Sequence, residues 1–223
     1  MAALGQSIRR SAVGLGLFAI FTGGTIAVTQ VMTADRIDQQ ARKAEAAALF
    51  EIIPEDRHDN DLLKSTITLP ADSLLGTSKP VQAWLAKRSG ETTGVILPVV
   101  AEEGYSGAIH LLVSIDQTGH ILGVRVTQHH ETPGLGDKIE VRKTPWITMF
   151  TGESLGNPPA QQWKVAKDGG AFDQFTGATI TPRAVVKAVK QALMYFSEHR
   201  AQLMHATFQT SHRSLDDGDK NQS

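Results

Sequence analysis

Residues 107–128 have the sequence GAIHLLVSIDQTGHILGVRVTQ, and this stretch decides the fold class of the chain. Residues 107–115 and 120–128 are both rich in β-branched and other apolar side chains, which favour strands. Between them lies the segment DQTG, whose first residue Asp116 and last residue Gly119 match the pattern of a type I turn. The sequence therefore predicts an antiparallel hairpin.

Shorter apolar segments surround the hairpin. We expect strands over residues 64–69, 81–87 and 95–101, because proline, glycine and serine residues separate these segments. After the hairpin we expect a helix over residues 137–150, interrupted by Pro145.

Closer to the C-terminus, a short strand is expected over residues 163–166 and a turn over 168–170. From Pro182 the chain carries apolar residues at helical spacing to about His199, which predicts a long final helix. No internal repeat is evident, and the sequence predicts an α+β fold.

The N-terminus differs from the rest of the chain, because residues 11–33 contain no charged side chain. A helix of this length spans the roughly 30 Å of membrane hydrocarbon. A cleaved signal peptide is the alternative, but its apolar core is usually shorter. The pair Arg9 and Arg10 before the run favours a cytoplasmic N-terminus, which would place the following domain outside the cytoplasm.

These patterns predict one anchor and one mixed α+β domain. A helix is expected to leave the membrane after residue 34, either continuing the span or following a short break, and Pro54 is expected to end it. The expected segments are a cytoplasmic N-terminus at residues 1–10, a transmembrane anchor at 11–33, a juxtamembrane helix and loop at 34–60, the α+β domain at 61–207 and a polar tail at 208–223.

Composition excludes several kinds of site. The net charge of -1 gives no basic surface for nucleic acid. The chain has no cysteine, so disulfides and iron–sulfur ligation through cysteine are excluded. His129 and His130 do not suggest a metal site, because adjacent strand residues point to opposite faces and no third ligand is evident.

Residues 173–182 have the sequence DQFTGATITP just before the final helix. Part of this stretch is explained by a helix entrance, with Thr181 as N-cap and Pro182 at the first helical position. A helix N-terminus also attracts phosphate, and Gly177 would let the backbone approach a ligand closely. However, the chain has no Walker lysine here and no GxGxxG motif, so a freely exchanging nucleotide is poorly supported.

The pattern Asp-x-x-Thr-Gly-Ala-Thr-x-Thr over residues 173–181 resembles a flavinylation signature. In proteins with that signature, a separate flavin transferase uses FAD to esterify the hydroxyl that follows Gly-Ala with FMN. Residues 131–136, ETPGLG, resemble the second flavin-contacting loop of the same domain, although alone they would suggest a Pro-Gly turn. Both motifs behind an anchor resemble the FMN-binding domain family of Rnf/Rsx G subunits and of the C subunits of sodium-pumping NADH:quinone reductases.

The resemblance implies a role for each motif residue. The phosphate of FMN would be esterified to Thr179. The remaining residues implied are the phosphate neighbours Thr176, Gly177, Ala178 and Thr181, the ring or ribityl contacts Glu131, Thr132, Leu135 and Gly136, and the loop-shaping residues Asp173, Pro133 and Gly134.

The resemblance also implies a function, which is electron relay within an ion-translocating oxidoreductase complex. It implies a bacterial inner-membrane chain with a single pass, a periplasmic domain, other complex subunits as partners and a flavin transferase for maturation. No general base or nucleophile for a substrate is evident, so the chain would not be catalytic on its own. The alternative is an anchored extracytoplasmic binding or assembly module without covalent flavin.

Overall fold

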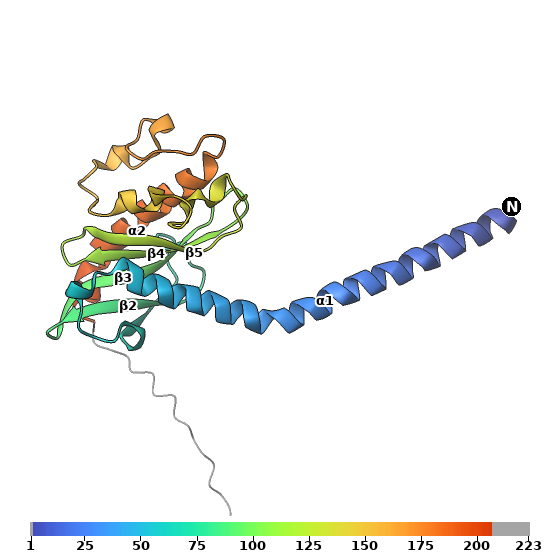
Figure 1. Ribbon diagram of the computed structural model, residues 1–223, viewed down its shortest axis with the longest axis horizontal. Coiled ribbons are helices and arrows are strands. Elements are labelled where there is room, and N and C mark those ends of the chain that lie inside the picture. The colour runs from blue at the N-terminus through green and yellow to red at the C-terminus, as the bar shows by residue number, and fades with distance from the viewer. Residues whose placement is uncertain (1, 207–223) are drawn as a thin grey trace, which may run out of the picture. The chain divides into compact units, whose positions relative to one another are not determined.

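The structure is a computed structural model that describes residues 2–206, so the expected polar tail at 208–223 lies outside the described residues. The chain divides into two compact units, Met1–Ala44 and Glu45–Ser223. Its main elements are α1 (Ala2–Ile52), β1 (Thr66–Leu69), β2 (Val81–Arg88), β3 (Glu91–Ala101), β4 (Ile109–Asp116), β5 (Ile121–Gln128) and α2 (Ile180–Met204) (Figure 1).

Helix α1 contains the expected membrane span. Its segment Ala12–Thr33 has a mean hydropathy of 1.8 and is long and apolar enough to cross a membrane. The hydroxyls of Thr22, Thr25 and Thr29 each donate to the carbonyl four residues earlier, at 2.7–2.8 Å. These polar groups are therefore satisfied within the helix, as hydrocarbon requires. The helix ends at Ile52, just before Pro54, as predicted.

Strands β1 to β5 form one antiparallel sheet in sequence order. The β4–β5 hairpin confirms the prediction, since the amide of Gly119 donates to the carbonyl of Asp116 at 3.1 Å. Gly119 has φ +94°, a conformation that glycine adopts without strain. Strand β3 begins at Glu91, earlier than expected, because Ser89 and Gly90 both take positive φ and turn the chain tightly after β2.

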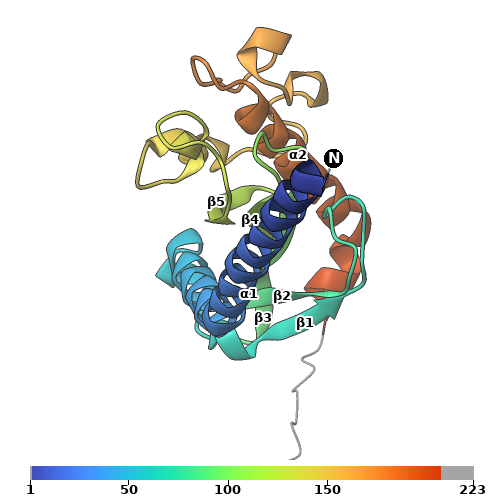
Figure 2. The ribbon, with the colours of Figure 1, turned by 90° about the vertical axis from the view of Figure 1, so that its right-hand side faces the viewer.

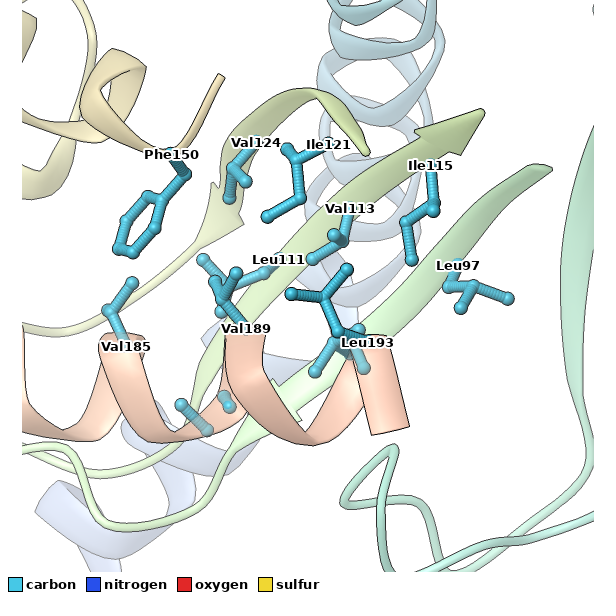
Figure 3. Packing of buried hydrophobic residues seen from close by; sticks show 14 of the residues in the cluster. Leu97, Leu111, Val113, Ile115, Ile121, Val124, Phe150, Val185, Val189 and Leu193 are labelled. Atoms are coloured by element: carbon cyan, nitrogen blue, oxygen red, sulfur yellow. The ribbon is translucent and has the colours of Figure 1, made fainter. Parts of the chain in front are cut away.

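The two faces of the sheet pack against different helices (Figures 1 and 2). Helix α2 covers one face, where its Val185, Val189 and Leu193 point toward the strands that carry Leu111 and Val113 (Figure 3). This face holds most of the hydrophobic core, so burial of apolar side chains fixes the position of α2 on the sheet.

The end of α1 packs on the opposite face. Leu49, Ile52 and Ile53 are buried there in one cluster with Trp84. A Cβ atom at Gly123 would lie 3.1 Å from the carbonyl oxygen of Ile52, so glycine lets the helix approach the strand closely. The last turn of α1 is thus part of the sheet domain.

Two of the predicted elements are wrong. Residues 137–150 are interrupted at Pro145 as predicted, but instead of an α-helix they form the 3₁₀ helices η3 (Gly136–Ile139) and η4 (Pro145–Phe150). Thr144, between them, has an extended backbone because a residue before proline avoids the helical conformation. Its side chain accepts a hydrogen bond from the amide of Trp146 and so caps η4. Residues 163–166 make only a single bridge from Val165 to Phe172 instead of a strand.

The turn after this bridge is confirmed. Gly169 has φ +79°, and its amide donates to the carbonyl of Ala166 at 2.9 Å.

Candidate functional site

The two sequence motifs lie far apart in the chain but meet at one cavity of about 270 Å³. A third segment, the loop before β4, also contributes. The lining residues are Tyr105, Glu131, Thr132, Leu135, Gly136, Gly177, Ala178, Thr179, Ile180 and Thr181. The fold therefore brings both predicted flavin motifs to a single site.

The chain turns sharply just before α2. Gly177 has φ +83°, and the amide of Ala178 donates to the carbonyl of Phe175 at 3.1 Å. Thr179 follows this turn as the residue before the helix, and its side chain makes no capping hydrogen bond. Its hydroxyl is thus not required by the helix end.

The predicted capping role of Thr181 is wrong. Helix α2 begins at Ile180, so Thr181 lies in the first turn, where it is only 1% exposed. Its hydroxyl donates to Oε2 of Glu131, which lies 50 residues earlier. This long-range partner holds Thr181 inside the helix, a position that local capping preferences do not predict.

Glu131 connects three segments of the site. The residue as a whole is 4% exposed, and its Oε1 accepts a hydrogen bond from the amide of Ser106 at 3.0 Å while Oε2 accepts from Thr181. A Cβ atom at Gly136 would lie 2.7 Å from Oε2 of Glu131 and 2.9 Å from the hydroxyl of Thr181. The glycine therefore leaves room for the hydrogen bonds that join Glu131 to Ser106 and Thr181, here named the clamp.

The loop at residues 131–136 is a compact turn that also lines the cavity. The carbonyl of Thr132 accepts hydrogen bonds from the amides of Leu135, at 3.1 Å, and Gly136, at 3.0 Å. Gly134 has φ +78°, and its amide donates to Asp137 at 2.8 Å. Pro133 is exposed on the outside of this turn. The turn and the flavin-loop interpretations are thus compatible.

Leu135 brings the two motif loops into contact. Its side chain is 44% exposed and lies 3.9 Å from the position that a Cβ atom would take at Gly177. A leucine with this exposure at a cavity leaves apolar surface available to a ligand.

The electrostatics of the cavity come from the helix and not from cations. Among the residues that the structure describes, Glu131 is the only charged one in the lining. Arg183, in the first turn of α2, instead donates to both carboxylate oxygens of Asp168, at 2.7 and 2.8 Å. This hydrogen bonding lowers the pKa of Asp168.

Two backbone amides at the start of α2 are suited to an anion. In the described part of the chain, no acceptor takes the amides of Ile180 and Thr181, and the next residue, Pro182, has no N–H. Unpaired amides at a helix N-terminus attract phosphate.

The neighbouring histidines have different surroundings. Nδ1 of His129 accepts from the amide of Glu131 at 3.0 Å, so the ring proton lies on Nε2, which is 3.0 Å from Glu140. His130 is exposed. Among the residues that the structure describes, no group of three or more side chains could hold a metal ion.

Sequence reasoning missed the third wall of the cavity. Tyr105 is 67% exposed and lies beside Ser106, whose amide binds Glu131. Ile180, at 46% exposure, was also missed. A tyrosine between Gly104 and Gly107, just before the hairpin, is the signal that could have indicated this loop.

Comparison with known proteins matches residues 104–194 to the FMN-binding domain family and residues 1–52 to the RnfG N-terminal region. Similar proteins are described as G subunits of ion-translocating oxidoreductase complexes. The one from Vibrio vulnificus is 49% identical over 200 residues, covering 90% of this chain and 94% of the relative. The Pseudomonas aeruginosa strain UCBPP-PA14 relative is 49% identical over 203 residues, covering 91% and 95%. The relative from Shewanella piezotolerans is 43% identical over 201 residues, covering 90% and 95%.

Proposed function

The chain belongs to the family of G subunits of ion-translocating oxidoreductase complexes, as a membrane-anchored FMN-binding protein, and we propose that its FMN is esterified to Thr179. We further propose that the chain relays electrons between other subunits of the complex. The observation that carries the proposal is the cavity, because it joins the Thr179 segment to the loop at residues 131–136.

The residues present fit the phosphate end of FMN. Gly177 allows the positive φ that the turn needs, and the amides of Ile180 and Thr181 supply donors with the positive end of the helix dipole. The described lining contains no lysine or arginine, so these residues would hold the phosphate by neutral dipoles. Free FMN would therefore be retained weakly, and a covalent ester supplies the retention that the cavity lacks.

The attachment chemistry assigns one step to Thr179. Its oxygen would form a bond to the FMN-side phosphorus of FAD, the pyrophosphate bond would break with AMP as the leaving group, and the hydroxyl proton would pass to a base of the transferase. Glu131 is the only candidate base that the described part of the chain places in the lining, but its two oxygens already accept from Ser106 and Thr181. Threonine needs an activating base, so we assign activation to a separate flavin transferase.

The rim of the cavity fits the apolar part of the cofactor. Tyr105, Leu135 and Ile180 expose large hydrophobic side chains around the same opening. When bound, the isoalloxazine ring supplies the redox chemistry. We place the ring against Leu135, with backbone groups of Thr132 and Gly136 as further contacts.

An intact-mass measurement tests the attachment. The chain produced together with the transferase is expected to gain the mass of one FMN less one water, and the chain produced without the transferase is expected to gain nothing. Equal masses in the two preparations would instead support an anchored binding or assembly module.

We also propose that α1 anchors the chain in the bacterial inner membrane with the domain on the periplasmic side. The support is the apolar segment Ala12–Thr33 behind Arg9 and Arg10. Protease added to spheroplasts is expected to digest the domain, and membranes are expected to retain the chain until detergent is added. Protection of the domain in intact spheroplasts would reverse the orientation, and a mature chain that starts after Ala34 would exclude the anchor.

A further inference from the structure

The segment that leads to Thr179 is held by a tryptophan from outside both motifs. Nε1 of Trp146 donates a hydrogen bond to the backbone carbonyl of Asp173 at 2.8 Å. The ring of Trp146 also packs against Phe175, with centroids 5.1 Å apart and planes at 66°. One side chain thus contacts residues 173–178, here named the attachment loop, at two points.

Trp146 is itself fixed by the segment that follows the other motif loop. The hydroxyl of Thr144 donates to the carbonyl of Lys138 at 2.7 Å and accepts from the amide of Trp146 at 3.3 Å. Phe150 packs edge-on against the indole, with centroids 5.5 Å apart. Trp146 is only 9% exposed, so the indole has little freedom to move away from the attachment loop.

Among the described residues, the attachment loop makes few other hydrogen bonds to the domain. The side-chain oxygen of Gln174 accepts from the amide of Lys167 at 3.0 Å, but both residues lie near the surface. The hydrogen bond between Ala178 and Phe175 stays within the loop. Phe175 is buried in the hydrophobic core at 8% exposure, so the loop is fixed at two points, by the burial of Phe175 and by the indole bond to the Asp173 carbonyl. The indole bond is the one that restrains the backbone at the start of the loop.

Resting on the proposed attachment at Thr179, we propose that Trp146 is a positioning residue for flavin transfer. Its indole N–H holds the Asp173 carbonyl, and this contact keeps the turn at Gly177 in the conformation that presents the Thr179 hydroxyl. The signature aspartate then contributes through its backbone carbonyl, since its side chain is exposed.

The test compares two tryptophan variants of the full-length chain. Trp146→Phe keeps an aromatic ring against Phe175 but removes the N–H donor. Trp163→Phe is the matched control, because its indole donates to the carbonyl of Ser154 at 3.2 Å, outside the attachment loop. With transferase and FAD, the initial transfer rate is expected to fall about fivefold to tenfold in Trp146→Phe, the equivalent of one lost hydrogen bond, and less than about twofold in the control.

The transfer rates distinguish a failure of the proposed Trp146 role from a failure of the proposed attachment at Thr179. A parental transfer rate in Trp146→Phe, or equal slowing in both variants, would overturn the role of Trp146. If the parent chain itself gains no flavin, the proposed attachment fails instead. Phe175→Leu provides a second test if Trp146→Phe does not fold: it weakens the ring contact, and a parental transfer rate in this variant also overturns the proposal.

Discussion

Thr179→Val is expected to carry no flavin on a denaturing gel, while remaining folded. Valine has nearly the shape of threonine but lacks the hydroxyl that would form the ester. The Thr179 side chain makes no capping hydrogen bond, so its replacement removes no interaction that the helix end needs. The measurements are in-gel flavin fluorescence and the thermal midpoint of the purified chain, which should stay within about 2 °C of the parent because surface changes rarely exceed 0.5 kcal/mol.

The neighbouring threonines supply the controls. Thr176→Val changes an exposed side chain, and we expect it to retain at least partial labelling. Thr181→Val should also retain some flavin. It removes the hydroxyl that donates a hydrogen bond to Glu131, which should lower stability by about 1–2 kcal/mol. Flavin fluorescence in Thr179→Val at the parental level would place the attachment elsewhere and refute the assignment.

Glu131→Ala is expected to destabilise the domain by about 3 kcal/mol, because it removes two hydrogen bonds to a charged acceptor. The amide of Ser106 and the hydroxyl of Thr181, a residue that is only 1% exposed, would both lose their acceptor. For a domain of this size, the thermal midpoint should fall by about 10 °C. Thermal unfolding followed by tryptophan fluorescence measures the change.

Two variants distinguish the clamp from a general effect of charge. Glu131→Gln keeps the size and an acceptor oxygen, so its loss should stay near about 1 kcal/mol. Glu103→Ala breaks an exposed ion pair with Lys187, whose side chain is 52% exposed, and should change stability by less than about 0.5 kcal/mol. Equal losses in Glu131→Ala and Glu103→Ala would contradict the clamp.

The parts of the fold predicted correctly from the sequence rest on local interactions. The β4–β5 hairpin depends on the turn from Asp116 to Gly119, and helix α2 depends on apolar spacing along one segment. The ends of these elements were less predictable. Strand β3 begins at Glu91 because of the conformations of Ser89 and Gly90, and neither residue belongs to a strong hairpin motif.

The wrong and missing predictions involve partners far along the chain. Thr181 is a residue type that favours the N-cap position. In the structure its hydroxyl instead donates a hydrogen bond to Glu131, and the residue lies inside the helix. Tyr105 is part of the cavity because Ser106 binds the same carboxylate. Periodicity and capping preferences describe only neighbouring residues, so they contain no information about these contacts.

The clamp at Glu131 also has a thermodynamic consequence for an attached cofactor. The attachment loop and Thr179 are continuous in sequence, whereas the cavity exists only after three distant segments have folded together. An esterified flavin stays on the chain when the domain unfolds, so its binding to the cavity becomes an intramolecular equilibrium. The stabilisation then depends on an effective concentration set by the short tether, and diluting the protein does not weaken it. Each chain would therefore carry a permanent optical reporter of its own folding.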